Sequence, residues 1–201
     1  MQDIPVPSPP YMTVKMPLSG PRRTQQGQSL VEFAVSSVVL LLLVGGLVDI
    51  GRSVFISEAL SNAAREGARH GAWFDAGRLS NPYLDDADIK SAVDAELASI
   101  GLPAAILKNP STTCPSPIDG NAYHNPPYAS SVYPSAANQP WLYICYDNTP
   151  GLDFTSPASS QSQVDLNVIV LYTYGPLTPL VKSQFGVFQV AANQHMTVQG
   201  S

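Results

Sequence analysis

An uncharged apolar run near the N-terminus is the feature that most constrains this chain. Residues 33–48 read FAVSSVVLLLLVGGLV and contain no Asp, Glu, Lys or Arg. A helix over residues 30–50 would span roughly 30 Å, which is the thickness of the hydrocarbon core of a bilayer. A buried core helix is the alternative, but the leucine-rich composition of the run favours a membrane-spanning helix.

The composition of the 201-residue chain excludes several other classes of protein. Only 12% of the residues are charged, and the net charge of -5 with ten Lys and Arg residues leaves no basic face for nucleic acid. The two Cys cannot form a zinc site alone, and the three His (His70, His124 and His195) are scattered along the chain. Nucleotide-binding, hydrolase and metalloprotease motifs are absent. We therefore expect no catalytic residues, no metal and no cofactor, and no enzyme activity.

The residues that precede the apolar run differ from the rest of the chain. Residues 1–27 hold six Pro, together with the basic residues Lys15, Arg22 and Arg23. This composition cannot supply a packed core and is typical of a disordered leader. Basic residues ahead of an apolar run favour a cytoplasmic N-terminus, and they also precede secretory signals. A secreted protein cleaved near Gly46 is therefore one alternative.

A more specific signal lies at the start of the apolar helix. Gly27 precedes the helix, and Glu32 follows five residues later, directly before Phe33. The arrangement resembles a class III prepilin signal, in which a membrane peptidase cuts after the Gly and the apolar helix stays on the mature chain. The resemblance implies cleavage between Gly27 and Gln28.

The carboxylate of Glu32 fits that interpretation. A carboxylate within a transmembrane segment is costly and normally has a partner. The new α-amino group at Gln28 of a neighbouring subunit would be such a partner, which would give Glu32 and the adjacent Phe33 a role in assembly. The alternative is that Glu32 lies near the membrane interface and reaches the headgroups.

The resemblance to a known family extends over residues 27–72. This stretch contains GQSLVEFA, the leucine run, D-x-G-R at residues 49–52 and NAAREGARHGA at residues 62–72. It is similar to the TadE-like family of the tight-adherence (Tad/Flp) pilus system, and residues 164–181 carry a weaker likeness. Members of that family are membrane-anchored pseudopilins or minor pilins that support pilus assembly, adhesion or secretion.

The resemblance also implies an organisation and a set of partners. Residues 1–27 would be a leader cleaved after Gly27, residues 28–50 the transmembrane half of a long helix, and residues 51–201 an extracytoplasmic head. The expected location is the bacterial cytoplasmic membrane, crossed once with the N-terminus in the cytoplasm, or a cell-surface pilus. The expected partners are other pilin or pseudopilin subunits, the assembly machinery, the prepilin peptidase and membrane lipid.

The second half of the predicted helix, which runs to Ala72, carries a face of small residues. Residues at spacings of three and one lie on one side of a helix, and small side chains allow another backbone to approach closely. This face packs either on the sheet of the same chain, which we favour, or on a neighbouring subunit. Its members are Leu60, Ala63, Ala64, Gly67, Ala68 and Gly71.

The rest of the chain predicts an α+β head of the type IV pilin kind. Apolar residues at helical spacing predict a second helix from Asp85 to a stop at Gly101, with acids in its first turn. A short strand is expected within residues 104–107. Alternating apolar residues predict longer strands over residues 141–146, 164–174 and 187–198, with an apolar turn at residues 175–180. We expect three or four strands in an antiparallel sheet.

The two cysteines flank a long Pro-rich stretch that has no basic residue. Two Cys in an exported domain usually pair, so we expect a disulfide between Cys114 and Cys145. The alternative is two free thiols, with Cys145 buried in its strand.

The same stretch suggests a rival function. A membrane-anchored extracellular binding protein could contact a ligand through aromatic side chains in and beside the Pro-rich loop. These are Tyr123, Tyr128, Tyr133, Trp141, Tyr143 and Tyr146.

Overall fold

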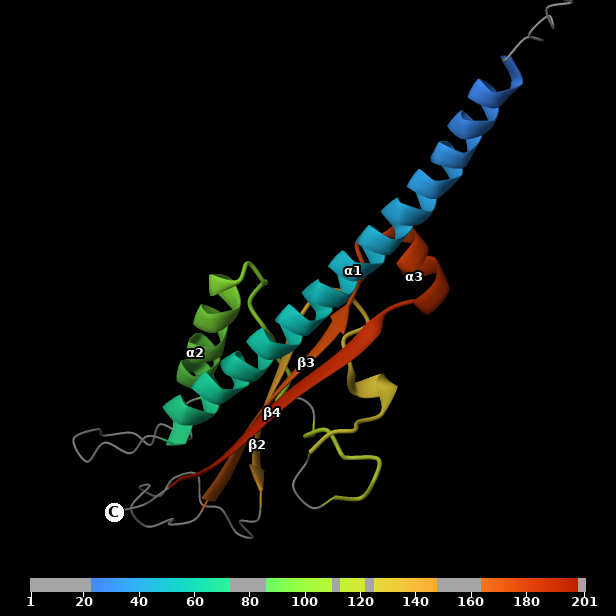
Figure 1. The fold of residues 1–201 in the computed structure, drawn as a ribbon. Coiled ribbons are helices and arrows are strands. Elements are labelled where there is room, and N and C mark those ends of the chain that lie inside the picture. Colours follow the sequence, from blue (N-terminus) through green and yellow to red (C-terminus); the bar gives the residue numbers. More distant parts are fainter. Residues whose placement is uncertain (1–22, 73–85, 110–112, 122–124, 148–163, 199–201) are drawn as a thin grey trace, which may run out of the picture. The chain divides into compact units, whose positions relative to one another are not determined.

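The computed structural model describes residues 23–72, 86–109, 113–121, 125–147 and 164–198. Its helices and strands follow the α+β pattern expected from the sequence (Figure 1). In chain order they are α1 (Arg23–Ala72), α2 (Asp86–Ser99), β1 (Ile106–Leu107), the 3-10 helix η2 (Ser130–Val132), β2 (Trp141–Asp147), β3 (Val164–Tyr174), α3 (Pro179–Phe185) and β4 (Phe188–Val198).

The chain divides into two compact units, residues 1–42 and 43–201. In the first unit the described residues belong to α1, and the side chains from Leu30 to Leu42 are exposed, except for a half-buried Ser37. Apolar side chains that stay exposed among the described residues do not form a packed core. This observation favours the membrane-spanning interpretation of the apolar run over the buried one.

The second unit is built on a four-stranded sheet in the order β1-β2-β3-β4. β3 is central and pairs antiparallel with β2, through Ile144↔Val168, and with β4, through Val170↔Ala192. The sheet is nevertheless mixed, because the two-residue strand β1 pairs in parallel with β2. The expectation of an antiparallel sheet is wrong at this edge, because the long connection from Leu107 to Trp141 lets β2 run in the same direction as β1.

One face of the sheet is covered by α1 and α2. The side chains of alternate β3 residues, from Leu166 to Tyr174, point into this core and are at most 1% exposed. Ile89, Val93 and Leu97 of α2 close the core beside α1. The period-two pattern of β3 and the helical spacing of α2 therefore define the same apolar layer.

The small-residue face of α1 lies in this core. Leu60, Ala63, Ala64 and Ala68 are fully buried. A Cβ atom added to Gly67 would lie 2.5 Å from Val93 Cγ2 and 3.3 Å from Val168 Cγ1. The face is thus packed on α2 and on the sheet of its own chain, which is the alternative that the sequence favoured.

The opposite face of the sheet is covered by the loops between β1 and β2. Tyr128, Tyr133 and Tyr143 pack there with Ile169 and Leu171. A disulfide joins Cys114 in the loop to Cys145 in β2, as the sequence predicted. The two cysteines are 31 residues apart in the sequence. Closing a loop of that length removes unfolded-state entropy worth roughly 3–4 kcal/mol in the loop-closure model.

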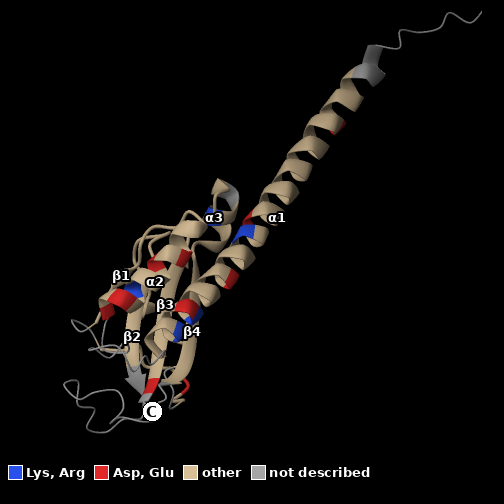
Figure 2. Cartoon of the chain, turned by 90° about the vertical axis from the view of Figure 1, so that its left-hand side faces the viewer, with Lys and Arg blue, Asp and Glu red and all other residues tan. Residues whose placement is uncertain are grey.

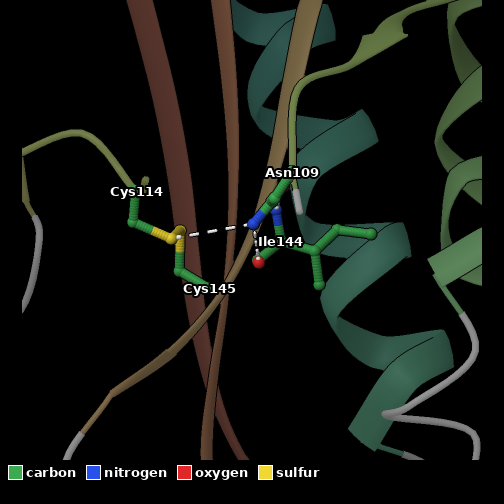
Figure 3. Close-up of a disulfide and its surroundings, with 4 residues drawn as sticks. All are labelled: Asn109, Cys114, Ile144 and Cys145. Carbon is green, nitrogen blue, oxygen red and sulfur yellow. Dashed lines mark hydrogen bonds between the residues drawn. A yellow bond between two sulfur atoms is a disulfide. The ribbon is translucent and has the colours of Figure 1, made fainter. Parts of the chain in front are cut away.

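Asn109 continues the sheet edge where β1 ends. Its side-chain amide donates to the carbonyl oxygen of Ile144, and its Oδ1 accepts from the N–H of Ile144 at 2.9 Å (Figure 3). The amide nitrogen also lies 3.8 Å from the sulfur of Cys114. One side chain therefore supplies the backbone groups of Ile144 with the partners that a longer β1 would have supplied.

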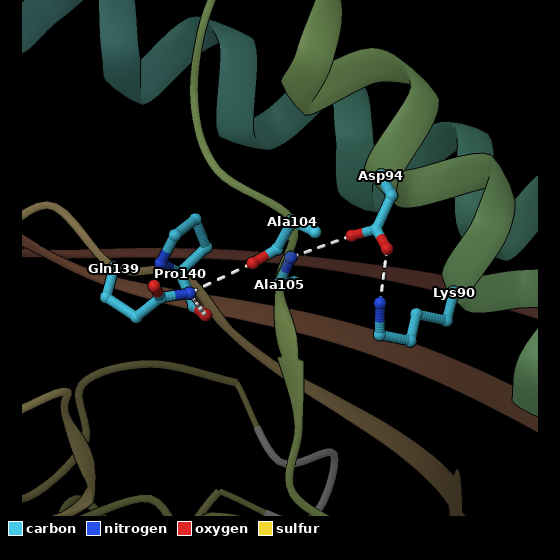
Figure 4. A network of polar contacts seen from close by, with 6 residues as sticks. All are labelled: Lys90, Asp94, Ala104, Ala105, Gln139 and Pro140. Carbon is cyan, nitrogen blue, oxygen red and sulfur yellow. Dashed lines mark hydrogen bonds and ion pairs between the residues drawn. The ribbon is translucent and has the colours of Figure 1, made fainter.

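A second set of polar contacts attaches α2 to the start of β1. The Asp94 carboxylate accepts from the backbone N–H of Ala105 at 2.7 Å and forms an ion pair with Lys90 (Figure 4). Gln139 Nε2 donates to the carbonyl oxygen of Ala104 at 2.9 Å. The short strand is held from both sides by side chains, because two residues of ladder pairing stabilise a strand weakly.

The helix α3 was not anticipated, because residues 175–180 were predicted to form only an apolar turn. α3 begins at Pro179, where the missing N–H of proline is tolerated, and Gly186 follows its last residue with φ 71°. It is seven residues long, which is shorter than the window in which helical periodicity can be recognised.

We predict that Gly67→Ala destabilises the second unit by about 1–3 kcal/mol, because the added methyl overlaps the stiff β-branched side chain of Val93. Gly51→Ala is the matched control, because a Cβ there meets nothing within 4 Å. The control should be neutral or slightly stabilising. Chemical unfolding of the two variants in detergent, followed by circular dichroism, measures the difference. Equal stabilities would contradict the close approach of α1 to α2.

Candidate functional site

The predicted processing and assembly residues lie at the start of α1. Gly27, Gln28, Glu32 and Phe33 are all exposed, and Phe33 is 73% exposed. Gln28 Nε2 donates to Glu32 Oε1 at 3.2 Å, which places the two side chains four residues apart on one side of the helix. The Glu32 carboxylate is therefore in reach of a partner outside this chain.

A buried carboxylate, Asp49, organises the first part of the second unit. Its side chain is 2% exposed and accepts hydrogen bonds from the segment that follows β3. The backbone N–H groups of Leu177 and Thr178 donate to it at 2.8 and 3.1 Å, and the Thr178 hydroxyl donates as well. The Tyr174 hydroxyl donates at 3.1 Å. Four donors thus satisfy one carboxylate, as a buried charge requires.

Two further contacts reinforce this junction. The guanidinium carbon of Arg52 lies 5.8 Å from the centroid of the Tyr174 ring, within the range of a cation–π interaction. A Cβ atom on Gly45 would lie 2.9 Å from Thr178 Cγ2, so the absence of a side chain at Gly45 lets the two segments approach. Burial raises the pKa of the Tyr174 hydroxyl, so the group remains protonated and able to donate at neutral pH.

The junction joins the D-x-G-R segment, whose ends are Asp49 and Arg52, to residues 174–178. Residues 27–69 match the TadE-like protein family. Comparison with curated proteins and with solved structures finds no significant match.

The TadE-like segment contains most of the α1 residues discussed so far. It includes Gly27, Glu32 and Asp49, as well as the buried small face as far as Ala68. Gly71, the last member of that face, lies just beyond it, and a Cβ there would overlap Ile89 at 2.8 Å. The segment therefore combines an exposed apolar part with a part that packs on the sheet.

The aromatic residues of the Pro-rich loop are mostly unavailable as a binding surface. Tyr128, Tyr133 and Tyr143 are at most 9% exposed and belong to the core of the outer sheet face. Trp141 is half-buried, with the Lys108 ammonium nitrogen 4.1 Å from the centroid of its ring. Tyr123, and the side chain of Tyr146, lie outside the described residues.

The described residues offer no arrangement that points to catalysis or metal binding. Within these ranges no group of three or more His, Cys, Asp or Glu side chains could hold a metal ion. His195 lies on the outer sheet face, opposite Met196, with its Nε2 3.1 Å from Asn125 Oδ1. His70 lies beside Asp88 of α2, with 3.4 Å between Nδ1 and Oδ2, and His124 falls outside the described part of the chain.

Sequence reasoning did not anticipate the role of Asp49. The sequence marks Asp49 only as the first residue of D-x-G-R and assigns it no partner. A signal was present, since a single acid at the end of a long uncharged helix requires a partner if it is buried. Its donors lie 125 to 129 residues away in sequence, so only the fold could identify them.

We predict that Asp49→Ala destabilises the second unit by about 1.5–3 kcal/mol, because it leaves buried donors without an acceptor. Hydrogen exchange of the Leu177 and Thr178 amides should accelerate more than that of the β3 amides. Glu58→Ala removes an exposed acid from the same helix and should change stability by less than about 0.5 kcal/mol. If protection of Leu177 and Thr178 survives in Asp49→Ala, the junction does not depend on this carboxylate.

Proposed function

We propose that the chain is a membrane-anchored, pilin-like structural subunit, a pseudopilin or minor pilin, that supports assembly of a Tad-type pilus or a related secretion apparatus. The observation that carries the proposal is the match of residues 27–69 to the TadE-like family. The family is structural rather than catalytic.

The character of α1 supports the membrane anchor. Residues 27–72 form one helix that is long and apolar enough to cross a membrane. Its large apolar side chains between Leu30 and Val48 are exposed, whereas Ile56 and Leu60 are buried in the core of the second unit. In the proposed arrangement, the exposed apolar part lies in lipid and the buried part belongs to a head on the extracytoplasmic side.

The start of the helix supports processing by a prepilin peptidase. In the proposed maturation, cleavage between Gly27 and Gln28 removes the leader and leaves the apolar helix on the mature chain. Residues 1–22 lie outside the described part of the structure, so the proposal of a leader there is based on the sequence alone. The new α-amino group at Gln28 of one subunit then pairs with Glu32 of a neighbour.

The two alternatives are less well supported. A binding protein that uses the Tyr-rich loop would need exposed aromatic side chains, but three of the six are buried. Cleavage near Gly46 would cut α1 in the turn before Asp49, next to the contact between Gly45 and Thr178. It would also remove the part of the TadE-like segment that precedes the cut.

We predict that Gly27→Leu leaves the full-length precursor in the membrane, because a bulky residue at the cleavage position does not fit a protease subsite that takes glycine. Gly20→Leu, the same substitution within the leader, should be processed normally. Mass spectrometry of the membrane-extracted proteins distinguishes a mature chain that begins at Gln28 from the precursor. A mature product of normal mass from Gly27→Leu would exclude the proposed cleavage.

We predict that Glu32→Ala is cleaved and inserted normally but fails to assemble. Removing one member of a buried ion pair leaves the other charge buried without a partner, which costs about 3–5 kcal/mol. Glu58→Ala, in the same helix but outside the apolar run, should assemble like the unsubstituted chain. Co-purification of tagged and untagged subunits from membranes measures assembly. Unchanged co-purification of Glu32→Ala would rule out the pairing.

A further inference from the structure

The exposed apolar side chains of the second unit are not spread over its surface. Apart from Ile106 and Ile118, the large exposed apolar side chains described for this unit lie in residues 43–55 of α1 or in residues 177–188. In the second group, Leu177 is 62% exposed and Phe185 is 70% exposed. Scattered exposed apolar residues are ordinary, but a contiguous patch marks an interaction surface.

The two groups form one surface because Asp49 holds them together. Its hydrogen bonds fix Leu177 and Thr178 against α1, and α3 starts at the next residue. Between α1, α3 and the start of β4 lies a groove of about 350 Å³. Ile50, Phe185 and Phe188 are among the residues that line it, and Figure 1 shows α3 beside α1.

Charges are sparse on this surface. α3 contains a single charged residue, Lys182, which is exposed. The acids and bases of α2 and of the last turns of α1 lie elsewhere on the unit (Figure 2). Asp49, the acid nearest to the groove, is already surrounded by its own donors. The surface therefore combines exposed apolar side chains with two cations, Lys182 of α3 and Arg52 of α1, and no free acid among its described residues.

We infer that α3 and the loop before it lie in the interface of the same phospholipid bilayer that α1 crosses, with Leu177 and Phe185 among the acyl chains and Lys182 at the headgroup phosphates. This inference rests on the membrane anchor of the proposed function. Residues 43–48 of the second unit are the end of the apolar run, and the groove starts at Gly46, so the patch continues the lipid-facing surface of the helix. Lysine next to apolar side chains is typical of such interfacial segments.

Lipid fits the surface better than the apolar run of a second copy. Residues 33–48 contain no acid that could pair with Lys182, whereas phospholipid headgroups supply phosphate. A lipid surface also accepts an irregular, shallow patch without the shape complementarity that a protein partner requires.

The test uses the full chain in phosphatidylglycerol-containing vesicles with a nitroxide at Phe185→Cys. The native disulfide keeps Cys114 and Cys145 out of the labelling reaction. Collision with oxygen, which concentrates in lipid, is compared with collision with a water-soluble nickel chelate. Ile118→Cys is the matched control, because Ile118 is 65% exposed but lies outside the patch. Leu40→Cys reports on the anchor itself.

We expect the ratio of oxygen to nickel collision to be several-fold higher at residue 185 than at residue 118, and independent of the protein-to-lipid ratio. A lipid-like value at residue 40 with a water-like value at residue 185 would overturn the interfacial placement and leave the anchor intact. Spin–spin broadening at residue 185 that grows with protein density would show that a second copy of the chain, and not lipid, covers this surface, and would overturn the inference. A water-like value at residue 40 would overturn both the anchor and this inference.

Discussion

The close approach of α1 to the sheet and to α2 is the contact on which the rest of the second unit depends. It is made by a face of small residues, in which the backbone at Gly67 comes within van der Waals reach of Val93 and Val168. Because no bulky side chain separates them, the helix and the sheet share one apolar layer. Larger residues at these positions would separate the layers and open voids around Leu166 and Ile89, and a loosely packed core is a less stable one.

The Asp49 junction is the polar counterpart of that contact. Apolar packing fixes how close α1 lies to the sheet, but it is non-directional and specifies the position of the helix along its axis less sharply than hydrogen bonds do. A carboxylate with four directed donors from Tyr174, Leu177 and Thr178 sets that position. The D-x-G-R segment and the stretch after β3 therefore form one buried site, the first through the Asp49 carboxylate and the second through its donors.

The same helix therefore carries two kinds of surface. From Phe33 to Val48 its large side chains are exposed and uncharged, and from Ile56 onward one face is buried and consists mostly of small residues. The proposed membrane anchor relies on this division, because the core of the second unit is built without the large side chains of the apolar run. The outer sheet face is stabilised separately, by buried tyrosines and by the disulfide between Cys114 and Cys145. Among its described residues, the loop there contains the 3-10 helix η2 and an isolated bridge between Pro117 and Tyr128.

The sequence by itself determined the long helix, the second helix, the three long strands, the buried face of α1 and the cysteine pairing. Each of these rests on a local period or on residue chemistry, such as the alternation in β3 or the three-and-one spacing from Leu60 to Gly71. Only the tertiary structure decided the parallel direction of β1, the existence of α3 and the partners of Asp49. A two-residue strand and a seven-residue helix are too short to show a period. The donors to Asp49 are more than a hundred residues distant, so they meet it only when β3 has been placed beside α1.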